Sequence, residues 1–303
     1  MKIKELGEIE LIKRIAKRAR LDSSVIKGIG DDAAVLRWTN GKRLLFTCDM
    51  LLEDVHFKMA KATPFQIGWK AIARNMSDIA AMGGMPKYAV VSIGMSPALS
   101  TRFLDELYRG IRKLADMFKV NIVGGDMSRS KKLTIDISMI GEAEKRDLTL
   151  RSGAIEGDVI LVTGSIGGSI KGRHLNFIPR LSEAQRLVRN FKINSMIDIS
   201  DGLVLDLWRI LNASCVGGRI YENTIPISKD ASSVESAIYD GEDYELLFTM
   251  SVNAARRFFK TALERFETPV TLIGEIMNRR YGYKLIKGDG KEKILGPRGF
   301  LQF

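Results

Sequence analysis

Histidine and cysteine are scarce in this chain of 303 residues, which contains two of each. The histidines are His56 and His174, and the cysteines are Cys48 and Cys215. Because zinc sites are built from His and Cys ligands, this composition disfavours zinc chemistry. The two cysteines form neither a C-x-x-C pair nor a disulfide framework, so we expect a reducing compartment.

Long apolar runs are also missing. No run approaches the roughly 18–20 residues that a membrane helix requires. The first residues, Met1 to Glu5, lack the apolar core of a signal peptide. We therefore expect a cytoplasmic protein without a membrane partner.

An excess of acidic residues is absent as well, because the net charge is +11. Such a charge is compatible with nucleic acid or with an anionic substrate. The Lys and Arg residues are scattered, however, and their densest group, between residues 13 and 20, is typical of a solvated helix face. Since no RNA-binding aromatic signature or zinc finger accompanies them, we expect no nucleic-acid partner, and a basic nucleic-acid-binding protein is the rival outside the enzymes.

The common nucleotide-binding motifs are missing too. Residues 28–33 match the dinucleotide pattern G-x-G-x-x-A, but Asp31 and Asp32 would repel a pyrophosphate unless a cation intervened. The Gly-rich loop at 164–169 does not satisfy the P-loop pattern, and protein-kinase and nucleophile-elbow signatures are absent. An ATP site in this chain would therefore be of a less common kind.

What the chain does contain is an alternation of predicted helices and strands. Apolar periodicity predicts helices at about residues 7–20, 65–82, 100–118, 181–191, 202–213, 229–238 and 253–265. It predicts strands at about residues 43–48, 88–94, 120–123, 133–140, 159–163, 216–221, 244–249 and 270–275. Pro64 suits the first turn of the second helix, and Gly83-Gly84 suits its end.

A change in composition between Arg151 and Asp158 separates two halves of the chain. Helices and strands alternate in both halves, which indicates an α/β or α+β protein. We expect an N-terminal domain at residues 1–150 and a C-terminal α/β domain at residues 151–303.

Carboxylates gather at Gly- and Ser-rich places in this basic chain. They occur at 31–32, at the predicted strand end Asp49, at Asp78, in the loop residue Asp126, and at 198–201 and 242–245. Several follow apolar strands, where sites are usually built. Each alone has an ordinary explanation, such as a turn, a loop or a helix cap. Their joint occurrence favours a metal site.

Asp78 is the sharpest case, because its helix is otherwise apolar and is expected to be buried. A buried carboxylate without a cation is costly. Asp78 therefore either pairs with Arg74 at i, i+4 or binds a metal ion, and both alternatives stay open. Hard oxygen ligands with so little histidine favour Mg²⁺ over zinc. Several such ions would hold a triphosphate and neutralise its charge.

A set of short motifs, in their order along the chain, resembles the thiamine-monophosphate kinase family. This family belongs to the aminoimidazole ribonucleotide synthetase-like superfamily. The motifs are G-I-G-D-D-A-A at 28–34, T-C-D-M-L with H-F at 47–57, N-M-S-D-I-A-A-M-G at 75–83, G-G-D at 124–126, R-S-G-A at 151–154, I-D-I-S-D-G-L at 197–203 and G-E-D-Y-E-L at 241–246.

The resemblance implies a role for individual residues. The Mg²⁺ ligands it implies are Asp32, Thr47, Cys48, Asp49, Asp78, Asp126, Asp198 and Asp201. The implied ATP contacts are Tyr108, Gly125, Asp126, Arg151 and Ser200. The implied contacts to the thiamine part are His56, Glu242 and Phe300. Cys48 stands where the family usually has threonine, so one side-chain oxygen ligand is lost there.

The resemblance also implies an activity and an assembly. The activity is the ATP-dependent phosphorylation of thiamine monophosphate to thiamine diphosphate, assisted by several Mg²⁺ ions. The acceptor is a phosphate monoester with a second pKa of about 6, so it is largely dianionic at neutral pH and we expect no catalytic base. The assembly is a homodimer in which the N-terminal mixed sheets pair into a barrel. The alternative within the enzymes is another ATP-using member of the superfamily with a different small substrate.

Overall fold

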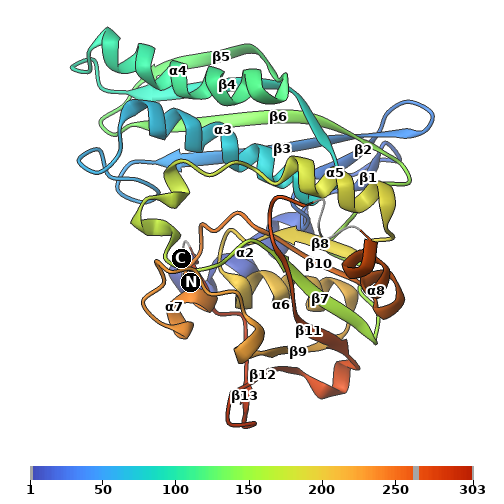
Figure 1. Ribbon diagram of the computed structural model, residues 1–303. Helices are drawn as coiled ribbons and strands as arrows, with labels where there is room; N and C mark the ends of the chain where they lie inside the picture. Colours follow the sequence, from blue (N-terminus) through green and yellow to red (C-terminus); the bar gives the residue numbers. More distant parts are fainter. Residues whose placement is uncertain (1–2, 262–265, 302–303) are drawn as a thin grey trace.

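The computed structural model of this protein describes residues 3–261 and 266–301 (Figure 1). Its first half is built around a six-stranded sheet. In spatial order the strands are β1 (Val25–Lys27), β2 (Ala34–Arg37), β3 (Lys42–Leu52), β6 (Thr134–Glu144), β4 (Met85–Met95) and β5 (Asn121–Arg129). The β4–β5 pair is parallel and the other pairs are antiparallel, which confirms the mixed sheet predicted for this half.

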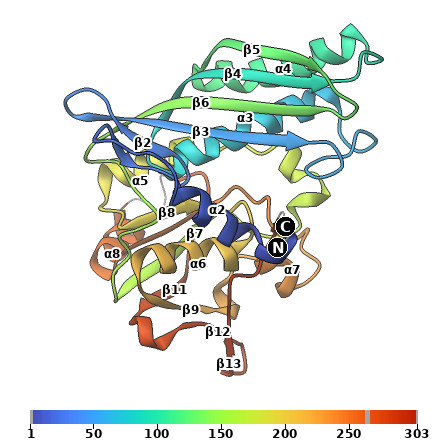
Figure 2. The same cartoon turned by 180° about the vertical axis from the view of Figure 1, so that it is seen from behind.

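One face of this sheet is covered by α3 (Pro64–Ala81) and α4 (Thr101–Phe118). In β6 every second residue is buried, among them Ile135, Ile137 and Met139. The opposite face carries exposed apolar side chains, and no helix of the described chain lies over it in Figure 2. We call this surface the open face and define it by Phe46, Met50, Tyr88 and Val90.

The start and the end of α3 follow from its flanking residues. Thr63 and Gln66 form a capping box, in which each side chain accepts a hydrogen bond from the other residue's backbone N–H. Pro64 occupies the first turn, where its missing N–H costs nothing. Gly83 follows the last turn with a φ of 69°, a left-handed conformation that glycine adopts readily and that suits a helix end. The predicted boundaries of this helix are therefore confirmed.

The second half is built around a seven-stranded sheet. In spatial order the strands are β13 (Glu292–Ile294), β12 (Tyr283–Ile286), β9 (Gly217–Tyr221), β11 (Val270–Met277), β7 (Asp158–Thr163), β10 (Leu246–Ser251) and β8 (Ser195–Asp198). The α-helices of this half are α5 (Leu181–Asn190), α6 (Leu203–Ser214), α7 (Val234–Tyr239) and α8 (Val252–Thr261). Short 3₁₀ helices are η1 (Ser169–Lys171), η2 (Arg173–Leu175), η3 (Glu222–Thr224) and η5 (Arg279–Tyr281).

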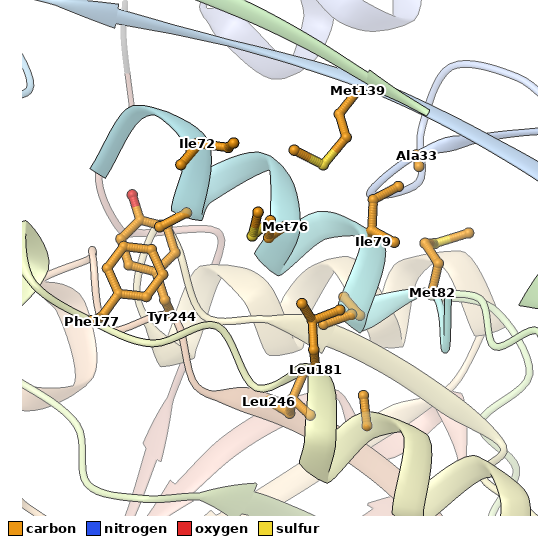
Figure 3. Close-up of a cluster of buried hydrophobic side chains, with 14 of the residues drawn as sticks. Ala33, Ile72, Met76, Ile79, Met82, Met139, Phe177, Leu181, Tyr244 and Leu246 are labelled. Atoms are coloured by element: carbon orange, nitrogen blue, oxygen red, sulfur yellow. The ribbon is translucent and has the colours of Figure 1, made fainter. Parts of the chain in front are cut away.

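Helix α3 lies between the two halves and packs against both (Figure 3). Its buried side chains meet Met139 from the first sheet on one side. On the other side they meet Leu181 of α5 and Leu246 of β10. Polar residues on this helix are therefore held in the junction between the two halves.

Several predicted boundaries were wrong. β3 continues past Asp49 to Leu52, so Asp49 lies inside a strand and not at its end. β5 continues to Arg129 and is largely exposed, so Asp126 lies in a strand and not in a loop. The N-terminal helices are α1 (Ile3–Leu6) and α2 (Glu8–Ala16), shorter than the predicted range. The predicted end of the last helix, at 262–265, lies outside the described residues.

The described part of the chain contains no helix with the length and apolar character needed to cross a membrane.

Candidate active site

Three aspartates from distant segments meet at the junction between the halves. Asp32 comes from the loop before β2, Asp78 from α3 and Asp198 from the end of β8. One carboxylate oxygen of each lies within 4.8 Å of the others. Asp32 and Asp198 are buried and Asp78 is half-buried. We call these three residues the aspartate cluster.

The surroundings of the aspartate cluster disfavour three separate negative charges. Burial raises the pKa of Asp78 well above its ordinary value, and neighbouring carboxylates, chiefly that of Asp49, raise it further. Burial and the carboxylate of Asp32 likewise raise the pKa of Asp198. A divalent cation at this point would remove that electrostatic cost.

Hydroxyl groups orient two members of the cluster. Thr47 Oγ1 donates a hydrogen bond of 2.7 Å to Asp78, and Ser77 Oγ donates one of 2.6 Å to Asp198. Asp32 accepts a hydrogen bond of 2.6 Å from the Arg151 guanidinium through one carboxylate oxygen. Its other oxygen, Oδ2, is buried without a hydrogen-bond partner among the described residues. An unused buried carboxylate oxygen beside two others is a donor set that fits Mg²⁺.

Arg74 does not pair with Asp78, so the ion pair considered from the sequence was wrong. Its guanidinium instead donates to Asp49 at 3.0 Å and to the backbone carbonyl of Met50 at 3.1 Å. Both acceptors lie on β3, which faces α3. Burial raises the pKa of Asp49, and the charge of Arg74 opposes that shift. Asp49 therefore lies beside the cluster but in contact with a protein cation.

Asp201 is also held by an arginine. Arg209 contacts Asp201 and the fully buried Asp206 at 2.6 Å each, and Asp206 accepts a 2.9 Å hydrogen bond from the backbone N–H of Asp201. Burial raises the pKa of Asp206 to about 7. Helix α6 starts after Gly202 without a side-chain cap, so the helix-cap explanation for residues 198–201 was wrong.

Cys48 and Asp126 lie away from the aspartate cluster. Cys48 alternates with Thr47 along β3 and is exposed on the open face. Asp126 is exposed and pairs with Ser92, which in turn pairs with Asp136 across the sheet. Burial and the charge of Asp136 raise the pKa of the Cys48 thiol, which disfavours the thiolate. In a single chain these two predicted ligands are not brought to the cluster.

The predicted ATP contacts occupy different settings. Arg151 joins the cluster through Asp32, and Ser200 lies between β8 and α6, where its carbonyl accepts from Glu242 N–H at 2.7 Å. Tyr108 lies half-buried on α4 against the core. Gly125 lies on β5, where a Cβ would come within 1.9 Å of the Val91 carbonyl oxygen.

A pocket of about 690 Å³ opens at the same junction. The three predicted thiamine contacts, His56, Glu242 and Phe300, all line it. Three lysines also line it, namely Lys58, Lys61 and Lys171. This volume is typical of small-ligand sites, and the lysines suit an anionic group on the ligand.

His56 is held as a neutral side chain. Its Nδ1 accepts a hydrogen bond of 3.0 Å from the backbone N–H of Leu52. Burial lowers the pKa of His56 to about 4. His56 is therefore suited to contact a ligand and is too weakly basic to take up a proton near neutral pH.

Lys70 was missed in the sequence. It is fully buried on α3, forms an ion pair with Glu242 and donates to the backbone carbonyl of His56 at 2.7 Å. Burial lowers the pKa of Lys70 to about 8. The available signal was a lysine within an apolar helix, which poses the same question of a partner as Asp78 does.

The fold and the acidic junction define an AIR synthase-related protein of two domains. The family model for the N-terminal domain of AIR synthase related protein matches residues 30–143, and the one for the C-terminal domain matches residues 171–286. A structure of a HypE–HypF complex, at 19% identity and a TM-score of 0.75, shares the fold.

Within this class the chain belongs to the thiamine-monophosphate kinase family. The thiamine-monophosphate kinase of Bacillus subtilis (strain 168) is 35% identical, over 98% of this chain and 100% of that protein. The Escherichia coli (strain K12) protein of the same name is 32% identical over 98% of each chain. The structure of AaThiL complexed with AMPPCP and TMP matches with a TM-score of 0.84 and 31% identity, over 100% of this chain and 99% of that one.

Proposed function

We propose that this chain transfers the γ-phosphoryl group of ATP to thiamine monophosphate, which gives thiamine diphosphate and ADP. Its full-length relatives carry the name of this activity, and a related structure holds AMPPCP and TMP. A different small acceptor, as in other superfamily members, is disfavoured by the identity of 35% to a thiamine-monophosphate kinase over nearly the whole chain.

The observation that carries the proposal is the position of the aspartate cluster relative to the pocket. Lys70, Arg74 and Asp78 follow each other at intervals of four residues on α3, so they share one side of the helix. Lys70 contacts Glu242 in the pocket wall, and Asp78 belongs to the aspartate cluster. Eight residues of helix span about 12 Å, so the pocket wall beside Lys70 and the aspartate cluster at Asp78 are separated by about that distance. This separation suits a substrate whose organic part lies in the pocket and whose phosphate lies at the cluster.

Mg²⁺ fits the donor set at the cluster. Asp32, Asp78 and Asp198 would hold it, with Asp49 and Asp201 as further carboxylates at the edge of the site. Thr47 keeps the lone pairs of its hydroxyl oxygen while it donates to Asp78, so it can still serve as a further ligand, whereas Cys48 is less suited because it lies on the open face. Bound Mg²⁺ would neutralise the phosphates that must approach each other.

The chain's own residues supply position and charge. Arg151, which contacts Asp32, would donate to a phosphate oxygen. A terminal phosphate oxygen of the acceptor forms the bond to the γ-phosphorus, and the bond to the ADP oxygen breaks. No proton has to leave the acceptor, because its second pKa is about 6. This agrees with a His56 that is neutral and weakly basic.

We also propose that two copies of the chain associate through the open face. The apolar side chains of Phe46, Met50 and Tyr88 are 45%, 49% and 50% exposed there. Large apolar side chains exposed together on one face of a sheet often mark a surface that a partner covers. Asp126 and Cys48 lie on this surface and would then be buried in the contact.

We further propose that the enzyme works in the cytoplasm. Cys48 and Cys215 are both free and exposed, which suits a reducing compartment.

A coupled assay of ADP release tests the activity. We expect ADP release that depends on thiamine monophosphate and on Mg²⁺, with thiamine as the control acceptor giving only background. Release that is equal with both acceptors, or absent with both, would contradict the proposal.

A further inference from the structure

The buried lysine of α3 joins two segments that line the pocket. Lys70 has no exposed surface. Its ammonium group forms an ion pair with the Glu242 carboxylate, from the loop before β10 in the second half of the chain. It also donates a hydrogen bond of 2.7 Å to the backbone carbonyl of His56, which follows β3 in the first half. One cation thus connects the two halves at the pocket wall.

Glu242 has little freedom in this arrangement. One carboxylate oxygen contacts Lys70, and the other accepts a hydrogen bond of 3.3 Å from the Tyr244 hydroxyl. Its backbone has a φ of 68°, and that of Tyr244 has a φ of 53°, both in the left-handed region that non-glycine residues rarely adopt. Such a conformation persists only where the surroundings hold it. The Lys70 contact is one of the interactions that hold it.

The Glu242 side chain remains 18% exposed, and it lines the pocket together with His56. A ligand can therefore reach Glu242, whereas it cannot reach Lys70. Any effect of Lys70 on a ligand has to pass through the residues that it contacts.

We propose that Lys70 is a positioning residue for thiamine monophosphate, because it fixes the Glu242 carboxylate and the His56 segment in the geometry that the pocket needs. This inference rests on the proposed function. It assigns Lys70 to recognition of the acceptor and not to ATP or to the transfer step, since its contacts lead to the pocket and not to the aspartate cluster.

The test is the Lys70→Met variant, which keeps an unbranched apolar chain and removes the charge. We expect the KM for thiamine monophosphate to rise by about 10- to 100-fold, the loss expected for one hydrogen bond to a charged group. The KM for ATP and kcat should stay within about twofold, since the aspartate cluster is untouched. The matched control is Lys113→Met, which removes an exposed lysine from α4 and should leave both KM values unchanged.

A double-mutant cycle with Glu242→Gln separates positioning from a general loss of stability. If Lys70 acts through Glu242, Lys70→Met should raise the KM for thiamine monophosphate much less in the Glu242→Gln background than in the wild type. Lys70→Met alone leaves the Glu242 carboxylate without its partner and could fail to fold. The double variant removes both charges, so it can then be compared with Glu242→Gln alone, and the two KM values should be similar.

Equal changes in the two KM values, no change in a folded variant, or an additive cycle would each overturn the inference while the wild type remains active. A wild type that is inactive on thiamine monophosphate would instead overturn the proposed function, and this inference with it.

Discussion

Asp32, Asp78 and Asp198 are carboxylates that lie close together, and a bound cation would remove the electrostatic cost of this arrangement. Burial and neighbouring carboxylates raise the pKa values of Asp78 and Asp198, and Asp32 keeps one buried oxygen without a partner among the described residues. The two hydroxyl donors, Thr47 and Ser77, orient these groups but carry no charge. At this scale the arrangement of the site suits a divalent ion.

Asp78→Asn should lower turnover at least about 100-fold, because it removes a carboxylate that would hold the Mg²⁺ acting on the reacting phosphates. The metal-free fold should survive, and its melting temperature should stay equal or rise, since a repulsive charge is removed. Steady-state kinetics and thermal unfolding in chelator measure the two effects. Asp116→Asn, at an exposed position of α4, is the control. Near-normal turnover of Asp78→Asn would contradict this account.

Stabilisation by Mg²⁺ should grow with pH. A carboxyl with a raised folded pKa stabilises the fold only while protonated, so metal-free stability falls as pH rises from the ordinary 3.8 through the raised values of Asp78 and Asp198. Metal binding needs the deprotonated carboxylates and offsets that loss. The rise in melting temperature on adding Mg²⁺ should therefore be larger at about pH 8 than at about pH 5. An equal rise at both pH values, or the same pH dependence in the Asp78→Asn variant, would argue against it.

Sequence reasoning at this scale identified Asp78 as a carboxylate on an otherwise apolar helix but did not identify its surroundings. A spacing of i, i+4 brings Arg74 near Asp78, yet it says nothing about β3, whose Asp49 competes for the same guanidinium. Lys70 was missed for the same reason, because its partner Glu242 is distant in the sequence. Contacts across elements are decided by the fold, which local spacing does not describe.

Glycines decide how closely elements approach each other in the first half. A Cβ at Gly68 would lie 2.0 Å from the Leu107 carbonyl oxygen, and one at Gly110 would lie 2.0 Å from that of Phe65. Helices α3 and α4 can therefore cross in backbone contact, which fixes α3 and the polar residues that it carries.

The pair Gly124 and Gly125 offers a matched test on β5. A Cβ at Gly125 would lie 1.9 Å from the Val91 carbonyl oxygen, whereas one at Gly124 would meet only a side-chain carbon of Val90, at 3.7 Å. Gly125→Ala should thus lower the free energy of unfolding by about 1–3 kcal/mol, the usual cost of overpacking. Gly124→Ala should be nearly neutral. Urea denaturation of both variants measures the difference. Equal losses of unfolding free energy would show that the close approach of Gly125 to Val91 is not what requires glycine there.

At the scale of elements, the sequence predicted the helices better than the strands. α3 and α4 were predicted closely because caps and apolar periodicity agree. β5 was misjudged because Gly124 and Gly125 suggested a loop, although they lie inside an edge strand. β1, β2, β8, β12 and β13 went unpredicted, since three- or four-residue strands carry too few residues for a clear alternation.

The whole molecule brings two halves together around α3, and the site is made only where they meet. The cluster takes Asp32 and Asp78 from the first half and Asp198 from the second, and the pocket is divided in the same way. The sequence, through its family resemblance, predicted the two-part fold. The boundary near residue 150 stays a prediction.

The open face makes a prediction at this scale. Phe46→Lys places a charge on the open face and should convert a dimer into a monomer in light scattering after size exclusion. Ile294→Lys is the control, because this residue is 81% exposed on β13, in the other half of the chain. A wild type that is monomeric at every concentration, or a Phe46→Lys variant that stays dimeric, would refute the proposed association.

A crystal structure with Mn²⁺, a non-hydrolysable ATP analogue and thiamine monophosphate, read by anomalous scattering, would test whether the three aspartates hold a divalent ion. We predict an anomalous peak within coordination distance of Asp32, Asp78 and Asp198, with the acceptor in the pocket lined by His56, Glu242 and Phe300. Full occupancy of both substrates with no metal at these three carboxylates would contradict it.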